Sequence, residues 1–167
     1  MKIVIAKNNK EFKVLKNDEI VVKGHRPKWY SSELCFFHNN KTYELKKKGF
    51  WGAAFTIFKS GRPIGEIVWS SRVGSKLILK TNGASEKSYW LKVEKTGKWY
   101  TSNRQYILCE NGETPVLTID YSLKKWKESL LAEFNDKEQD NYVLLIGALF
   151  MVRRKQIANS ASTVAVQ

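Results

Sequence analysis

Cysteine and histidine are scarce in this sequence, and their placement excludes several kinds of site. The two cysteines, Cys35 and Cys109, lie far apart and in no Cys-x-x-Cys motif, so no disulfide framework is predicted. The only histidines are His25 and His38. Cys35 and His38 have the spacing of half a zinc site, but no second pair of ligands follows. We therefore expect neither a metal nor a cofactor.

The motifs of common catalytic sites are also missing. Gly74-Ser75-Lys76 lacks the glycine-rich loop that cradles phosphates, and no Gly-x-Ser-x-Gly sequence is present. Glu110 and Glu113 flank a turn, where carboxylates are most simply solvated. No serine, histidine and aspartate occur in a recognisable catalytic context. The sequence therefore predicts a protein that is not an enzyme and has no catalytic residues.

Long apolar segments are missing as well. The first residues, Met1 to Asn8, lack the apolar stretch and cleavage site of a signal peptide, which predicts a cytoplasmic protein. The longest apolar run, Tyr142 to Val152, would span about 17 Å as a helix, whereas a bilayer has about 30 Å of hydrocarbon. We therefore expect no transmembrane span.

The run Tyr142 to Val152 nevertheless organises the chain. Its leucines, alanine and methionine favour a helix, and such a helix would be apolar on every side and must be buried. Asp140 or Asn141 can cap its first turn, and residues 153–155, all basic, would lie where the helix dipole favours cations. We predict a buried helix over about residues 141–156 and a flexible tail over 158–167. The residues expected in its core-facing set are Tyr142, Leu144, Leu145, Ile146, Leu149 and Phe150.

From the start to about residue 121, short runs rich in β-branched and aromatic residues are separated by turn residues at intervals of about ten. Such even spacing predicts a meandering all-β sandwich or barrel. A barrel closed around the helix would bury the apolar run and leave no exposed sheet edge. The turn signals are Asn8-Asn9, Asn17-Asp18, Asn39-Asn40, Gly49, Ser60-Gly61, Asn82-Gly83, Thr96-Gly97, Ser102-Asn103 and Asn111-Gly112.

Residues 121–134 fit two patterns. Leu123, Trp126, Leu130 and Phe134 fall at helical spacing, while alternate residues from 126 to 134 are apolar except for Glu128. The pattern alone favours a helix.

A long series of hairpins followed by one hydrophobic C-terminal helix with basic residues after it resembles the tubby C-terminal-like superfamily. This superfamily includes tubby, LURP-one-related and phospholipid-scramblase-like proteins. The resemblance implies a roughly twelve-stranded closed barrel wrapped around the helix, in a single domain over 1–157, with a strand rather than a helix over 126–134. The segments that carry it are Gly61-Arg-Pro-Ile-Gly-Glu-Ile-Val-Trp69, Leu117-Thr-Ile-Asp-Tyr121 with Trp126, and Tyr142 to Val152.

Tubby-like proteins bind phosphoinositides through basic residues on the barrel wall, and the resemblance implies a similar ligand here. No motif permits a residue-by-residue transfer of that site. The cysteine clusters and proline-rich N-terminal region of scramblases are absent, so lipid translocation is not expected.

Basic residues are in excess, with 29 Lys and Arg against 16 Asp and Glu, a net charge of +13 and a pI of about 9.7. This balance predicts attraction to anionic partners, although solubility alone could also require it. We expect reversible binding of anionic phospholipid head groups, with Lys46–Lys48 as the first choice because they precede the aromatic pair Phe50-Trp51. The candidate binding residues are Lys46, Lys47, Lys48, Arg62, Arg72, Lys76, Lys124 and Lys125.

The expected location is the cytoplasm, and lipid binding would add peripheral association with the membrane. The alternative is an intracellular module that binds a protein or nucleic acid and no lipid. Six tryptophans and seven tyrosines could stack on bases, but the tryptophans are spread at about one per hairpin, which suits barrel packing better.

Overall fold

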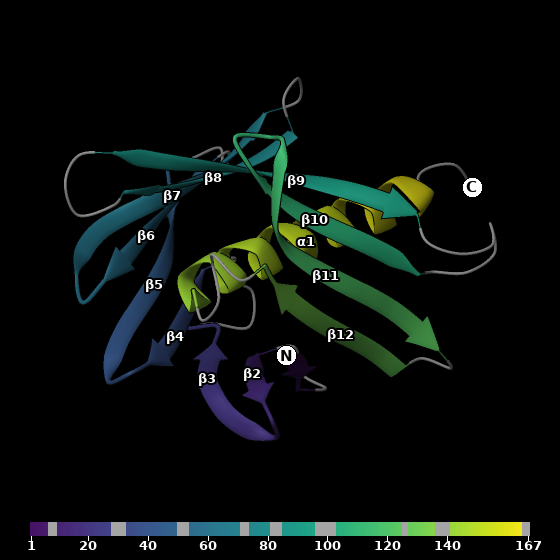
Figure 1. The fold of residues 1–167 in the computed structure, drawn as a ribbon, viewed down its shortest axis with the longest axis horizontal. Helices are drawn as coiled ribbons and strands as arrows, with labels where there is room; N and C mark the ends of the chain where they lie inside the picture. Colours follow the sequence, from purple (N-terminus) through teal and green to yellow (C-terminus); the bar gives the residue numbers. More distant parts are fainter. Residues whose placement is uncertain are drawn as a thin grey trace.

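The computed structural model describes residues 1–6, 10–27, 33–49, 54–70, 74–80, 85–95, 103–124, 127–135 and 141–164. In this part of the chain, twelve antiparallel strands pair in chain order, and β12 returns to β1 to close a barrel around one helix (Figure 1). The predicted fold class is confirmed. The elements are β1 (Lys2–Ile5), β2 (Glu11–Lys16), β3 (Glu19–His25), β4 (Leu34–His38), β5 (Lys41–Lys48), β6 (Ala54–Lys59), β7 (Arg62–Ser70), β8 (Gly74–Lys80), β9 (Glu86–Lys95), β10 (Arg104–Glu110), β11 (Thr114–Lys124), β12 (Lys127–Phe134) and α1 (Tyr142–Val164).

Tight turns join many of the strands. Both central residues of a type I′ turn need positive φ, which asparagine, aspartate and glycine adopt at the lowest cost. Asn111 and Gly112 have φ of 50° and 80°. The predicted turns at Asn17-Asp18, Asn39-Asn40 and Ser60-Gly61 also have two successive residues with positive φ. The predicted turns at Asn8-Asn9, Asn82-Gly83 and Thr96-Gly97 lie outside the described residues.

The barrel closes where the first strand meets the last. Lys2 lies opposite Leu131 in the antiparallel register of β1 and β12. At the end of this pairing, the amino group of Met1 donates to the carbonyl of Ala132 at 2.6 Å, and the Ala132 amide donates to the Met1 carbonyl at 2.8 Å. These bonds satisfy the backbone groups that an open edge would leave unpaired.

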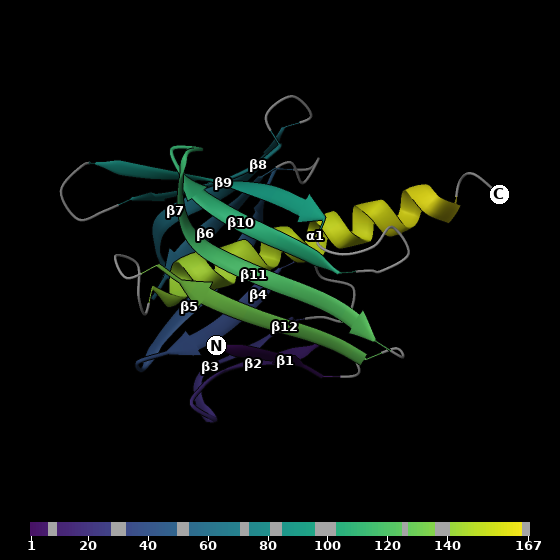
Figure 2. The ribbon, with the colours of Figure 1, turned by 45° about the vertical axis from the view of Figure 1, so that its right-hand side comes forward.

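Helix α1 passes through the middle of the barrel (Figures 1 and 2). Leu144, Leu145 and Ile146 are fully buried, and Tyr142 and Leu149 are nearly so. Phe150 is partly buried and packs against the core. This burial on all sides is what the continuous apolar run predicted.

The start of α1 is capped as predicted. The Asn141 side-chain oxygen accepts a hydrogen bond from the Leu144 amide at 3.1 Å. Asp140, the other predicted cap, lies outside the described residues. Farther along the helix, a Cβ on Gly147 would lie 2.9 Å from a methyl group of Leu77, so glycine allows α1 to approach β8 closely.

The end of α1 differs from the prediction. The helix continues to Val164, and its last turns project beyond the strands (Figure 2). Residues 153–155 therefore lie in the middle of the helix, and the last turn has no basic residue. The interpretation of these residues as partners of the helix dipole was wrong, because that effect is confined to the final turn.

In the segment that fitted two patterns, residues 121–124 end β11 and Lys127–Phe134 form β12, while residues 125 and 126 lie outside the described part of the chain. The helical spacing was misleading, and the strand implied by the resemblance is confirmed. Leu130 and Ala132 face the core, whereas Leu131 between them is 51% exposed. Glu128 lies on the same face of β12 as Leu130 and Ala132. It forms an ion pair with Arg153 of α1 at 2.6 Å, which explains why a charged residue occurs among the apolar ones.

Candidate anion-binding surface

The predicted cluster Lys46–Lys48 lies at the end of β5, and Lys46 and Lys48 have acidic partners. Lys46 forms an ion pair with Glu44, and Lys48 forms one with Glu66, both at 2.9 Å. The hydrogen bond to Glu44 raises the pKa of Lys46. These lysines are exposed, but the two ion pairs reduce the positive potential that they offer to an external anion.

Of the other predicted basic residues, Lys76 of β8 lies in the same cross-strand row as Lys48, three strands away, through Ala54 and Val68. The Lys76 ammonium nitrogen lies 4.6 Å from the Trp90 ring centroid, and Arg62 is at the start of β7. Arg72, Lys125 and the side chain of Lys124 lie outside the described part of the chain.

Two arginines of α1 contact residues of the barrel strands. Arg153 donates to both carboxylate oxygens of Glu128, at 2.8 and 2.6 Å. The Arg154 guanidinium lies 5.1 Å from the Phe55 ring centroid and 4.8 Å from that of Trp69. Burial lowers the pKa of Arg154. The basic residues that follow the apolar run thus connect the helix to the barrel wall.

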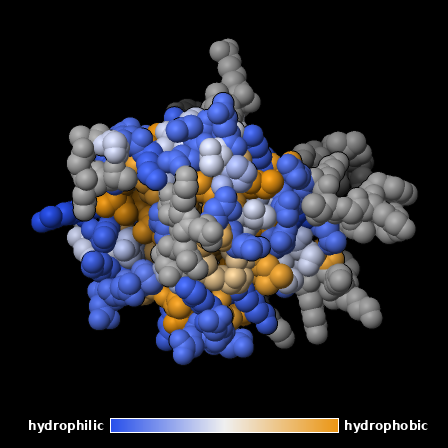
Figure 3. All heavy atoms as spheres, viewed as in Figure 1, coloured by the Kyte–Doolittle hydropathy of each residue, from blue (hydrophilic) through white to orange (hydrophobic). Residues whose placement is uncertain are grey.

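Exposed large apolar side chains are grouped on one wall of the barrel. Among the described residues, the four such side chains are Val4, Ile20, Phe37 and Leu131, each between 41% and 51% exposed. They belong to β1, β3, β4 and β12, which together with β2 form consecutive strands. Hydrophobic residues show between hydrophilic ones along the lower part of Figure 3, where Figure 1 places β2, β3 and β4. A grouped exposed apolar surface is a mark of an interaction site.

Four residues form a continuous row across this wall. Val4 lies opposite Lys13, Lys13 opposite Lys23, and Lys23 opposite Phe37. With adjacent strands about 4.8 Å apart, this β1–β4 row spans about 15 Å. It places two lysines side by side between two exposed apolar side chains.

A second row runs beside the first and has the same character. Leu131 lies opposite Lys2, Lys2 opposite Leu15, and Leu15 opposite Ile20. Together the two rows present three lysines among exposed or partly exposed apolar residues.

Ion pairing distinguishes the lysines of the two rows from Lys46 and Lys48. Within the described residues, no ion pair involves Lys2, Lys13 or Lys23. The nearest carboxylates along β2 and β3 belong to Glu11 and Glu19, which are the first residues of those strands. Asp18, Asp120 and Glu133 line a surface hollow together with Lys2, so the positive charge that the wall offers to an external anion is mainly that of Lys13 and Lys23.

Sequence reasoning missed this wall because its members are dispersed along the chain. Alternation in Glu11-Phe-Lys-Val-Leu-Lys16 does point Lys13 outward while Val14 is fully buried. The sequence does not contain the register that places Lys13 beside Lys23 and Val4. A search for consecutive lysines selects Lys46–Lys48 instead.

The suggested half zinc site does not form. Cys35 lies opposite His25, whereas the His38 ring nitrogen Nδ1 lies 3.0 Å from the Val21 carbonyl oxygen. Among the residues that the structure describes, no three His, Cys, Asp or Glu side chains are grouped closely enough to hold a metal ion.

Comparisons of the chain with protein-family models, with curated proteins and with solved structures give no match. The barrel with a C-terminal helix is compatible with a tubby-like fold. In the described residues, no helix has the length and apolar character required to cross a bilayer.

Proposed function

We propose that this protein binds anionic phospholipid membranes reversibly, without catalysing a reaction, through the outer wall formed by β12, β1, β2, β3 and β4. The observation that supports this function is the β1–β4 row, in which Lys13 and Lys23 lie side by side between exposed Val4 and Phe37. Lysines attract anionic lipid at about 1 kcal/mol each near the surface. The apolar side chains would enter the interfacial region beside them.

We infer further that the chain is related to the tubby C-terminal-like superfamily and acts at the cytosolic membrane surface. The support is the order of its elements, which are twelve antiparallel strands followed by a helix inside the barrel. Under this proposal the binding wall differs from the cluster Lys46–Lys48.

The test is co-sedimentation with vesicles of phosphatidylcholine alone and of phosphatidylcholine with a phosphoinositide, at low and at physiological salt. The test variant is Lys13→Gln with Lys23→Gln. The matched control is Lys46→Gln with Lys48→Gln, because each double variant lowers the net charge of +13 by two. At about 1 kcal/mol per lysine, we expect the test variant to bind anionic vesicles about 30-fold more weakly. The control should bind almost as the parent protein does.

The contribution of the apolar side chains can be measured separately, as the vesicle binding that remains at physiological salt. Phe37 is 47% exposed, and Phe37→Ser should weaken mainly the binding that survives physiological salt, because salt screens charges but not apolar contacts. Equal losses in both double variants, or no binding of the parent protein to anionic vesicles, would overturn the proposal. Stronger binding to oligonucleotides with a steeper salt dependence would indicate a nucleic-acid module instead.

A further inference from the structure

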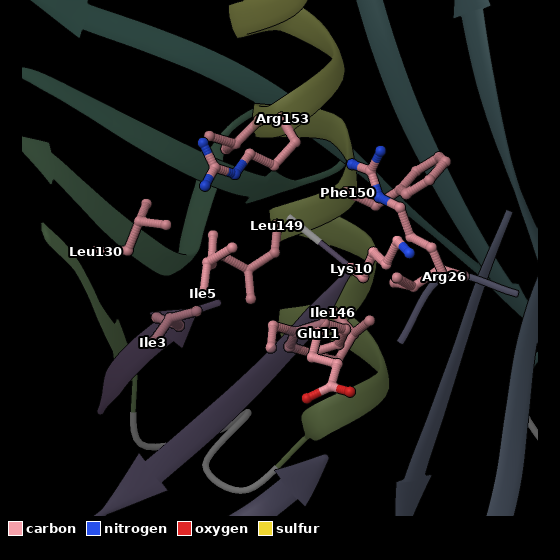
Figure 4. Close-up of a pocket in the computed structure, with 13 residues that line it drawn as sticks. Ile3, Ile5, Lys10, Glu11, Arg26, Leu130, Ile146, Leu149, Phe150 and Arg153 are labelled. Atoms are coloured by element: carbon pink, nitrogen blue, oxygen red, sulfur yellow. The ribbon is translucent and has the colours of Figure 1, made fainter. Parts of the chain in front are cut away.

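A cavity of about 70 Å³ lies inside the barrel, between α1 and the strands β1, β2 and β12. Ile5, Phe12, Ile146 and Leu149 are among the apolar residues that line it (Figure 4). A cavity of this size has room for about five water-sized groups. Because most of its lining is hydrocarbon, an alkyl chain suits it better than water does.

Basic groups stand at the border of this apolar space. Lys10, Arg26 and Arg153 line the cavity together with one acidic residue, Glu11. The Arg26 amide donates to the Lys10 carbonyl at 2.8 Å, which fixes the start of β2 beside the end of β3. In Figure 4 the Arg26 and Arg153 guanidinium groups lie toward one end of the lining, and the Glu11 carboxylate points away from them.

The two guanidinium groups differ in their pairing. Arg153 is held by both oxygens of Glu128. Arg26 is half-buried, and no acidic side chain of the described residues pairs with it. Burial, followed by repulsion from Arg153, lowers the pKa of Arg26. A half-buried cation without a partner is costly, and an anion placed beside it would remove that cost.

We propose that this cavity binds a soluble anionic amphiphile, with the end of a single alkyl chain in the apolar space and the anionic head group on Arg26. The head group is a carboxylate or a phosphate, both of which match the planar guanidinium. The Arg153–Glu128 pair bounds the site and is not its anion receptor. This ligand site is inside the barrel and does not depend on membrane binding by the outer wall.

The first experiment titrates the full-length protein with butanoate, hexanoate, octanoate and decanoate, each below its critical micelle concentration. Chemical shifts of the Arg26 side chain and of the Ile146 and Leu149 methyl groups report on the two ends of the site. Affinity should rise about fourfold per methylene while the chain fills the cavity and then level off. Hexyl phosphate should bind in the same place, whereas inorganic phosphate should bind at least tenfold more weakly than hexyl phosphate.

The second experiment removes the charge at the receptor. Arg26→Gln should abolish the preference for hexanoate over uncharged hexanol, while hexanol itself still shifts the methyl groups. Arg62→Gln is the matched control, since it removes one exposed arginine at the start of β7 and should leave the preference unchanged. Leu149→Phe fills part of the cavity and should weaken hexanoate and hexanol alike.

Several results would overturn this inference. One is that the ligands change the chemical shifts of surface residues only. Another is affinity that keeps rising with chain length, because nonspecific adsorption has no fixed capacity. A third is a hexanoate preference that persists in Arg26→Gln. The Lys13→Gln with Lys23→Gln variant should bind hexanoate normally, so a failure of the cavity site and a failure of the membrane site are distinguishable.

Discussion

Lys13 and Lys23 lie directly opposite each other on β2 and β3. Like charges at opposed positions of an antiparallel pair repel, by roughly 0.2 to 1 kcal/mol. Natural sheets usually avoid such pairs, and this one sits in the row that we propose to meet anionic lipid. The pair is therefore a local cost that an anionic ligand would offset.

Replacing one of these lysines by glutamate should raise the stability of the protein and weaken its binding to vesicles. Lys13→Glu creates an opposed ion pair with Lys23, so the free energy of unfolding at low salt should rise by about 0.5 to 1 kcal/mol. The gain should fade as salt screens the pair. Chemical denaturation at two salt concentrations measures it, and vesicle binding of the same variant should fall. A variant that is less stable than the parent at low salt would contradict the opposed geometry.

The ion pair between Glu128 and Arg153 should appear in the pH dependence of stability. The hydrogen bond from the Arg153 guanidinium holds the pKa of Glu128 below its ordinary range. A carboxylate with a lowered folded-state pKa contributes stability above its unfolded pKa of about 4.3, and this contribution is lost as pH falls through the folded value. Glu128→Gln should thus be less stable than the parent at pH 7 and equal to it in acid.

The size of this effect should be modest. The Glu128 side chain is 35% exposed, so solvent screening keeps the expected loss below about 1 kcal/mol. Melting temperatures of both proteins across the acidic range test it. A difference in melting temperature between the two proteins that stays constant with pH would mean that protonation of Glu128 does not break the ion pair in this way.

Gly65 of β7 should tolerate no side chain. A Cβ at this position would lie 2.4 Å from the Ile78 backbone oxygen, and backbone cannot move aside cheaply. Gly65→Ala should destabilise the protein by about 1 to 3 kcal/mol, which thermal unfolding would measure. Gly147→Ala is the comparison: its Cβ would meet only the Leu77 side chain, whose nearest methyl group lies at 2.9 Å, and alanine favours the helix. Gly147→Ala should therefore cost less than Gly65→Ala, and the reverse order would contradict this account.

Leu145 should be indispensable to the barrel. It is fully buried in α1, and Leu145→Asp would place an unpaired charge in the core. We expect this variant to yield no folded protein in the soluble fraction. Leu145→Met, which keeps the volume approximately, should fold with a loss under about 1.5 kcal/mol. A soluble Leu145→Asp variant with the parent melting temperature would show that the helix is not buried.

The local features of the fold could be predicted from the sequence because they depend on neighbours along the chain. Asn-Gly and Asn-Asn pairs set hairpin turns through their tolerance of positive φ. The continuous apolar run required a buried helix, and Asn141 marked its start. Charge and composition suggested an anionic partner without locating where it would bind.

The tertiary structure decided which distant residues are neighbours. The spacing of the apolar residues favoured a helix for residues of β12, because the charged Glu128 interrupted the alternation expected of a strand. The strand accommodates Glu128 because Arg153 of α1 forms an ion pair with it. Lys48 lies beside Glu66 of β7 only in the folded barrel, whereas Glu44 is two residues from Lys46 on β5. Val4, Lys13, Lys23 and Phe37 form one row only because the register of four strands aligns them. The sequence determines which side chains are charged. Strand pairing and barrel closure determine which distant residue each charged side chain contacts and how far it is exposed to solvent.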